Sequence, residues 1–121
     1  MTSPPRFTPG AFVLLHLVNP TEKFWGILGE LGVAGVTLRG ISVEAFDDWT
    51  SQAARPEEEL TLDLGTMFFP LFRIERLFLD ESVGQVESYR QRFARRVGRR
   101  VEDYLGLTGH GENDEGSSIP S

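Results

Sequence analysis

Residues 24–42 read FWGILGELGVAGVTLRGIS, and this stretch decides the expected fold. Two apolar segments, KFWGILGEL (23–31) and GVTLRGIS (35–42), are separated by only a Gly-Val-Ala turn, a spacing that predicts a β-hairpin. Glycines recur within or beside both segments, at Gly26, Gly29, Gly35 and Gly40. A glycine inside a strand marks a bulge, a tight bend or the close approach of another backbone. The hairpin therefore predicts a strongly bent sheet.

Apolar stretches before and after the hairpin predict further strands. AFVLLHLV (11–18) is a nearly continuous apolar run ended by Asn19-Pro20, as in a strand that is covered on both faces. TMFFPLFRIERLFLDE (66–81) resumes a strand-like pattern. Because Pro70 cannot donate to a ladder, we expect it at an edge, at a bulge or at the joint between two strands. These segments predict a small, strongly bent antiparallel sheet or partly open barrel of about five strands.

Two segments have helical periodicity instead. Apolar residues three or four positions apart, with Ser42 as a possible cap, predict a short helix at 43–54. Ser82 followed by Gln85 fits a capping box, and apolar residues repeat from Val83 to Tyr104, so we expect a long amphipathic helix at 82–105, packed on the sheet. The fold class is therefore α+β.

The length and composition predict a single domain. The chain has 121 residues. We expect one domain at 11–106, in which 11–81 forms the barrel, with a disordered lead-in at 1–10 and a disordered acidic tail at 107–121. The longest apolar run is far too short to cross a bilayer, and the N-terminal residues do not resemble a signal peptide, so we expect a cytoplasmic protein with no membrane contact.

The residues offer little for catalysis. The absence of Cys excludes disulfides, a thiol nucleophile and Cys-ligated zinc. His16 has no second His at ligand spacing, His110 lies in the tail, and the neighbours Asp47 and Asp48 point in different directions on a helix. No nucleophile elbow or phosphate-binding glycine loop occurs. We therefore expect no enzyme activity, no metal and no cofactor.

The charge distribution singles out the last predicted helix. The chain has 12 basic and 18 acidic residues, a net charge of −6, yet residues 82–105 hold six Arg against three acidic side chains and carry +3. Within this segment, four arginines form a possible contact surface for nucleic acid or a partner: Arg92, Arg95, Arg96 and Arg99. The alternative is a solvated face, or one paired with acidic residues such as Glu57–Glu59. Ala94 and Gly98, four positions apart, predict close packing of this helix against the sheet or against a second helix.

The barrel segment also resembles a known family. Gly26-Ile27-Leu28, followed by Val36 and Leu38, is similar to the strand pattern of Sm-like and SH3-like small barrels across residues 11–81. The segment from Pro70 to Leu77 resembles an apolar-Pro-x-x-Arg-Ile pattern of small bacterial β-proteins. The Sm-like resemblance implies a five-stranded barrel and RNA binding, and we carry no site residue over from it.

Two functional hypotheses follow. The first is a non-catalytic interaction or assembly module that binds a protein partner or a second copy through a sheet edge or the C-terminal helix. The alternative is an RNA-binding protein that uses the four arginines, with Trp25 or Phe72 as stacking surfaces.

Overall fold

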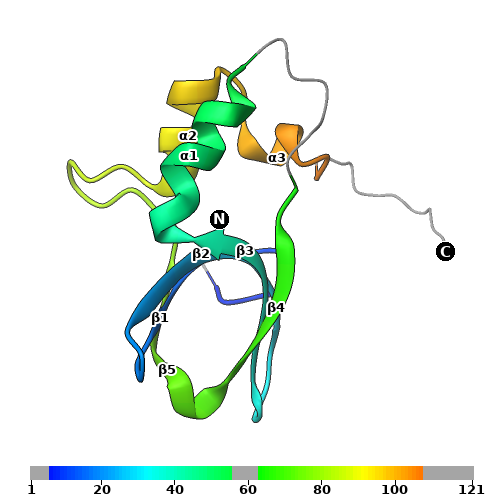
Figure 1. Ribbon diagram of the computed structural model, residues 1–121, viewed down its shortest axis with the longest axis vertical. Helices are drawn as coiled ribbons and strands as arrows, with labels where there is room; N and C mark the ends of the chain where they lie inside the picture. The colour runs from blue at the N-terminus through cyan, green and yellow to red at the C-terminus, as the bar shows by residue number, and fades with distance from the viewer. Residues whose placement is uncertain (1–5, 56–62, 108–121) are drawn as a thin grey trace, which may run out of the picture.

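The chain forms one five-stranded antiparallel sheet with short helices at one end (Figure 1). The computed structural model describes residues 6–55 and 63–107. The strands are β1 (Phe12–Leu17), β2 (Glu22–Leu31), β3 (Gly35–Ser42), β4 (Gly65–Pro70) and β5 (Ile74–Leu79). The helices are α1 (Val43–Ala53), α2 (Tyr89–Val97) and α3 (Val101–Tyr104), with a 3-10 turn η1 (Leu71–Arg73) between β4 and β5. The predicted α+β class and five strands are confirmed.

The connection between the last two strands curls the sheet. The strand order is β4-β3-β2-β1-β5, so β4 and β5 lie at opposite edges although only η1 joins them. Pro70 ends β4 immediately before η1, which confirms the predicted joint between two strands. The turn is fixed on both sides, because the Leu71 amide donates to the Ala34 carbonyl at 2.9 Å and the Val18 amide donates to the Arg73 carbonyl at 2.8 Å.

Two of the predicted glycine positions are required by close contact between strands. A Cβ at Gly26 would lie 2.3 Å from the Arg39 carbonyl oxygen, and one at Gly40 would lie 2.2 Å from the Trp25 carbonyl oxygen. The register of β2 against β3 also shifts between Leu28 and Glu30, where a bulge bends the strand. Strands β2 and β3 are therefore in close backbone contact at these glycines, and their register shifts at the bulge.

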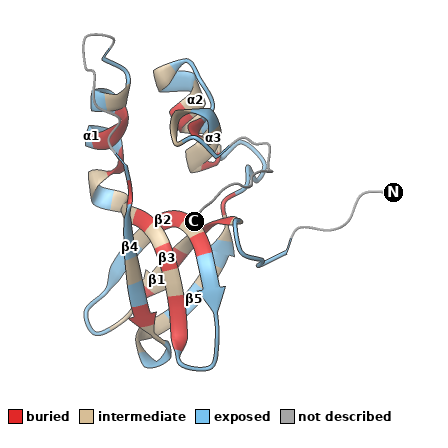
Figure 2. Cartoon of the chain, turned by 90° about the vertical axis from the view of Figure 1, so that its right-hand side faces the viewer, coloured by how far each residue is buried: buried red, intermediate tan, exposed pale blue. Residues whose placement is uncertain are grey.

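The sheet has a separate core on each face. One cluster packs the strands against one another and contains Val13, Leu15, Leu17, Leu28, Val36, Leu38 and Phe69. The other packs the opposite face against the helices and contains Phe12, Trp25, Phe46, Trp49, Leu64, Phe93 and Val101. Figure 2 shows buried residues on both the strands and the helices. The strand alternation explains the division, because neighbours such as Phe12 and Val13 point to opposite faces.

The short predicted helix is confirmed within one residue of its end. Ser42 caps α1, since its hydroxyl oxygen accepts from the Ala45 amide at 3.3 Å. Phe46 and Trp49 of this helix are buried against the sheet, and the centroid of the Phe46 ring lies 5.1 Å from that of the Trp25 ring. No helix in residues 6–55 and 63–107 is long and apolar enough to cross a membrane.

The prediction of one long helix at 82–105 is wrong. Residues 82–88 form an arm in which Val83 and Val86 exchange two backbone hydrogen bonds of 3.0 Å (Figure 1). The true cap is Ser88, whose hydroxyl oxygen accepts from the Gln91 amide at 3.0 Å. The helix ends at Val97, and a separate turn of helix, α3, begins at Val101. Valines three residues apart fit a helix, but they also fit a tight hairpin around Gly84.

The predicted close packing within the chain is not found at Gly98, whereas the part of the prediction that concerns Ala94, and the alternative of a second helix, stay predictions. Gly98 is the C-cap of α2, with a φ of 88°, and its amide donates to the Ala94 carbonyl at 2.9 Å. No atom in the described part of the chain lies within 4 Å of a Cβ placed on Gly98, apart from its own neighbours. Glycine is needed there because it adopts the left-handed conformation that ends the helix.

Several predictions lie outside the described residues. They concern the first five residues of the lead-in, the acidic tail from 108 onward with His110, and the possible acidic partners Glu57–Glu59.

Candidate functional site

The four predicted arginines all make contacts within the chain. From α2, Arg96 Nη1 donates to Asp47 Oδ1 at 2.7 Å and to Thr50 Oγ1 at 3.2 Å. Arg92 Nη1 donates to the same Asp47 oxygen at 3.4 Å. Asp47 belongs to α1, so these ion pairs join the two helices. The Arg92 guanidinium also lies 4.9 Å from the centroid of the Tyr89 ring.

The other two arginines have local partners. Arg95 Nη2 donates to Glu87 Oε1 at 2.5 Å, and this contact lowers the pKa of the Glu87 carboxyl below its ordinary value. Arg99 Nη2 donates to the Asp103 carbonyl at 3.0 Å, and its guanidinium lies 5.7 Å from the Tyr104 ring centroid. Each arginine of the predicted contact surface therefore has a partner in the protein's own helices or in the arm.

A buried carboxylate, which the sequence analysis did not select, anchors the helices to the sheet. The Asp80 side chain is fully buried and accepts hydrogen bonds from Trp25 Nε1 at 3.0 Å, the Tyr89 amide at 2.8 Å and the Arg90 amide at 3.0 Å. These two amides belong to the first turn of α2, where free N–H groups and the helix dipole favour a negative charge. Asp80 thus fixes the start of α2 onto Trp25 of β2.

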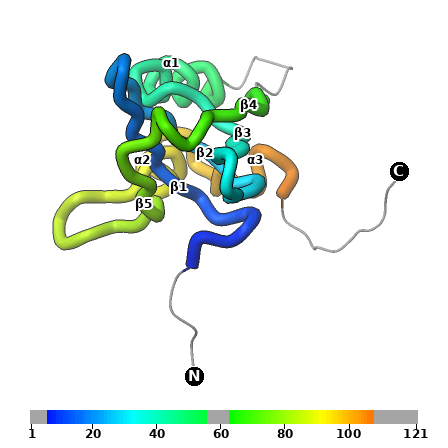
Figure 3. The backbone as a smooth tube through the Cα atoms, turned by 90° about the horizontal axis from the view of Figure 1, so that it is seen from below, coloured from blue at the N-terminus to red at the C-terminus, as the bar shows by residue number. Residues whose placement is uncertain are grey.

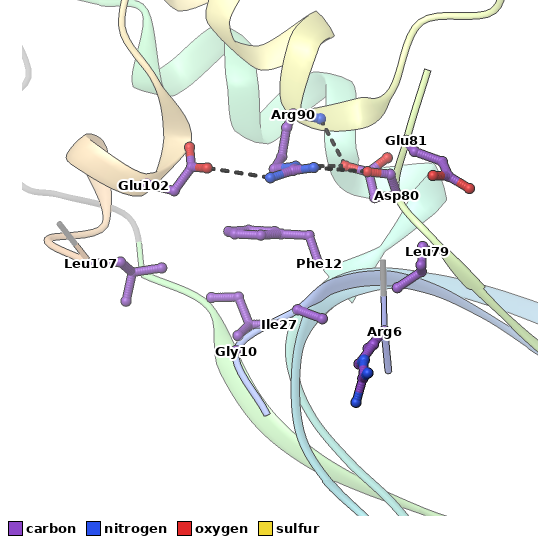
Figure 4. A pocket seen from close by; sticks show the side chains of 11 residues that line it. Arg6, Gly10, Phe12, Ile27, Leu79, Asp80, Glu81, Arg90, Glu102 and Leu107 are labelled. Carbon is purple, nitrogen blue, oxygen red and sulfur yellow. Dashed lines mark hydrogen bonds and ion pairs between the residues drawn. The ribbon is translucent and has the colours of Figure 1, made fainter. Parts of the chain in front are cut away.

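Beside Asp80 lies a hollow of about 550 Å³. Figure 4 shows the Arg90 guanidinium between Asp80 and Glu102, above the ring of Phe12. The Arg90 Cζ is 5.1 Å from the Phe12 centroid, its Nη1 is 3.4 Å from Glu102, and its Nη2 donates to the Asp80 carbonyl at 3.0 Å. Arg90 is therefore paired with both Asp80 and Glu102, and these contacts hold α2 and α3 on the sheet.

His16 has no ligand-forming neighbours. It pairs across strands with Lys23 on β2 and Arg76 on β5, and its ring lies 4.8 Å from the Phe78 ring. Burial and these two cations lower the pKa of His16 below its ordinary value, and Glu75 partly opposes them. Within residues 6–55 and 63–107, no group of three or more His, Asp and Glu side chains is placed to hold a metal.

An apolar surface is carried by the β2–β3 turn and η1, which lie at the end of the sheet opposite the helices (Figures 1 and 3). It consists of the exposed side chains of Leu31, Val33, Phe68, Leu71 and Phe72, which we call the apolar end. Val33 is 96% exposed and Phe72 is 84% exposed, and the other three are about half exposed. The hydrogen bond from the Leu71 amide to the Ala34 carbonyl places η1 beside the β2–β3 turn, and Val33 and Phe68 line the same groove.

The two stretches of sequence that carry the apolar end contain no charged residues. Residues 31–38 and 64–72 contain no Asp, Glu, Lys, Arg or His. A groove of about 340 Å³ runs between the β2–β3 turn and Phe68, with Glu30 as the one charged residue in its lining. Monomeric soluble proteins rarely expose a contiguous apolar patch of more than a few hundred Å². An uncharged surface with two nearly fully exposed apolar side chains is typical of a contact with another protein.

The two predicted stacking residues are not brought to the arginines. Trp25 has no exposed surface, so it cannot stack on a base. Phe72 is exposed, but it lies in η1, at the end of the sheet away from α2 (Figure 1). Phe72 stands out in the sequence as an aromatic residue, whereas the other residues of the apolar end fit ordinary strands and turns.

Comparison with known protein-family models gives no match to this chain, and comparisons with curated proteins and with solved structures give none either. The resemblance to Sm-like and SH3-like barrels therefore stays a prediction.

Proposed function

We propose that the protein is a non-catalytic interaction module that binds a protein partner through the apolar end. The observation that carries this proposal is the exposure of Val33 and Phe72 on two stretches, 31–38 and 64–72, that contain no charged residues. Burial of one large apolar side chain is favourable by about 1.5–3 kcal/mol. A partner that covers Val33 and Phe72 would gain this free energy. Backbone hydrogen bonds fix η1 to the two adjacent turns, so little conformational entropy would be lost when a partner binds there.

The alternative, RNA binding through the four arginines, has less support. A phosphate would have to compete with Asp47 and Glu87 for Arg92, Arg96 and Arg95. Neither candidate stacking ring can act together with these arginines, because Trp25 is buried and Phe72 lies in η1 at the other end of the sheet. We therefore prefer the interaction module.

We also propose that the curled sheet is a partly open barrel of the Sm-like or SH3-like kind. This proposal is supported by the short η1 link between the two edge strands and by an apolar cluster enclosed by all five strands.

Site-specific photo-crosslinking in living cells tests the interaction proposal. The photoreactive residue p-benzoylphenylalanine would replace Phe72 in the full chain, and Val86 of the arm in a control. Val86 is also exposed and apolar, but it lies outside the apolar end. We expect defined protein adducts from position 72, and we expect the second substitution Val33→Glu to remove them. Absence of adducts at position 72, or equal adducts from positions 72 and 86, would contradict the proposal.

A further inference from the structure

A row of nitrogen-bearing side chains crosses three neighbouring strands of the sheet. His16 of β1 is paired with Lys23 of β2 on one side and with Arg76 of β5 on the other. Residues directly opposite one another in antiparallel strands point to the same face, so the three side chains share one face of the sheet. Lys23 and Arg76 are exposed and His16 is half-buried, so solvent reaches the row. We call these three residues the Lys-His-Arg row.

This arrangement is unfavourable for the protein on its own. Like charges directly opposite one another in a sheet are destabilising, and Lys23 and Arg76 flank a histidine that can itself become charged. Lys23 forms no ion pair with any residue that the structure describes, and Arg76 is paired with its sequence neighbour Glu75 at 3.5 Å. An anion bound over His16 would replace this repulsion with attraction.

The ring of Phe78 holds two members of the row at the surface. Its centroid lies 4.8 Å from that of the His16 ring and 5.7 Å from Arg76 Cζ, and the Phe78 side chain is 39% exposed. Contact with one ring restricts both groups, so they lose less conformational entropy when they bind a ligand. Lys23 has a flexible stem and approaches the same ligand from the other side of His16.

The acidic side chains near the row leave it positive. Glu22 and Glu44 line a hollow together with Lys23, but Glu22 is paired with Arg73 at 3.1 Å. Neither carboxylate forms an ion pair with Lys23. Glu75 acts on His16, and it only partly opposes the effect of the two cations.

From these observations we infer that the Lys-His-Arg row binds the phosphate group of a small phosphate monoester. Such a group carries about −1.5 to −2 charges at neutral pH and has three acceptor oxygens, one for each member of the row. An ammonium, a guanidinium and a protonated imidazole are all donors without an acceptor, so they suit an anion and not a metal. The site uses no residue of the apolar end, and the inference does not depend on the proposed interaction module.

Phosphate binding and protonation of His16 should favour one another. In the free protein, burial and the cations Lys23 and Arg76 lower the pKa of His16, and Glu75 raises it. If protonation of His16 tightens phosphate binding, bound phosphate must raise the pKa of His16 by the same factor. We expect protonation to tighten binding about tenfold, which corresponds to a rise of about 1 in the pKa of His16.

Proton NMR of the full chain tests the inference, because imidazole resonances report the protonation of each histidine. The chain has two histidines, His16 and His110, and the variant His16→Gln identifies which resonance is His16. Titrations of pH in sodium phosphate and in NaCl of equal ionic strength separate binding from screening. We expect a higher pKa of His16 in phosphate and the same pKa of His110 in both salts. Equal pKa values of His16 in the two salts would overturn the inference.

Variants that remove one charge make the test specific for the row. Lys23→Gln and Arg76→Gln should each weaken phosphate binding, followed by the His16 resonance at fixed pH, by about fivefold. Arg55→Gln removes the same charge from an exposed position outside the row and should leave binding unchanged. Without phosphate, the two row variants should instead raise the pKa of His16, because each removes a cation that lowers it.

A diester completes the test of the ligand class. Dimethyl phosphate carries a single charge, so we expect it to raise the pKa of His16 much less than inorganic phosphate does. Equal effects of the two compounds, or equal weakening of phosphate binding by Arg55→Gln and by the row variants, would overturn the inference.

Discussion

Replacement of Asp80 by Ala is expected to destabilise the fold more than any other single loss of a charged group described above. The side chain is fully buried and accepts three hydrogen bonds, from the Trp25 indole and from two backbone amides of α2. Without it, the Trp25 Nε1 donor stays buried with no acceptor, which costs about 1–3 kcal/mol. The start of α2 also loses its acceptor, a cost of about 1 kcal/mol, as with a lost helix cap.

The ionic contact adds to this cost. Arg90 Nε lies 3.6 Å from Asp80 Oδ2, and removal of one partner from a buried pair destabilises by about 3–5 kcal/mol in total when the other charge is left uncompensated. The Arg90 side chain is 39% exposed and keeps its contact with Glu102, so we place the Asp80→Ala cost at about 3–4 kcal/mol.

Urea unfolding followed by tryptophan fluorescence measures this free energy, because Trp25 and Trp49 both lie in the core that Asp80 stabilises. Asp47→Ala is the matched control, since Asp47 is 60% exposed and its ion pairs should be worth less than about 1 kcal/mol. Losses of similar size in the two variants, or a loss below about 1 kcal/mol for Asp80→Ala, would refute the anchoring role of Asp80.

Three further perturbations test other parts of the structure. Because the pKa of His16 is lowered in the folded protein, the folded protein binds fewer protons than the unfolded chain, and the free energy of unfolding should fall as pH drops below 6.5. In urea titrations at several pH values, His16→Gln should remove this part of the pH dependence. Parallel pH profiles for the two proteins would contradict it. Gly98→Ala should lower stability by about 1 kcal/mol, because α2 ends there in the left-handed region; an unchanged unfolding midpoint would show that the cap is not needed. Replacement of all four predicted contact arginines by Gln should leave RNA retention on filters unchanged at low and moderate salt; salt-dependent binding by the parent that the variant lacks would restore the RNA-binding hypothesis.

The strands and α1 could be predicted because their local signals agree with their tertiary contacts. The apolar run at 11–18 contains β1, and the Gly-Val-Ala turn joins β2 to β3 as expected. Ser42 caps α1, and Pro70 marks the joint with η1. At these positions, a turn residue or a cap allows few alternative conformations.

The C-terminal segment could not be predicted because two local signals compete there. Ser82-x-x-Gln85 and Ser88-x-x-Gln91 both fit a capping box, and only the second caps a helix. The choice is made by Asp80, whose carboxylate bonds to the Tyr89 and Arg90 amides and so fixes where α2 begins. The arm therefore moves the start of the helix from the predicted residue 82 to Tyr89.

The candidate site was missed for a different reason. An uncharged surface arises when 31–38 and 64–72, which are far apart in sequence, meet through η1 and the β2–β3 turn. Each stretch alone has the composition of an ordinary strand. The arginines were conspicuous in sequence, yet their partners Asp47 and Glu87 come from α1 and from the arm, and such pairing depends on tertiary structure.

Protection of the apolar end from solvent tests the central claim most directly. The protein has no Cys, so Val33→Cys and Val86→Cys each provide a single thiol for a labelling reagent. We predict that Val33→Cys is labelled more slowly in cells, where the partner is present, than as the purified protein, while Val86→Cys is labelled at the same rate in both. Labelling of Val33→Cys at the same rate in cells and as the purified protein, measured relative to Val86→Cys, would contradict the claim that this surface binds a partner.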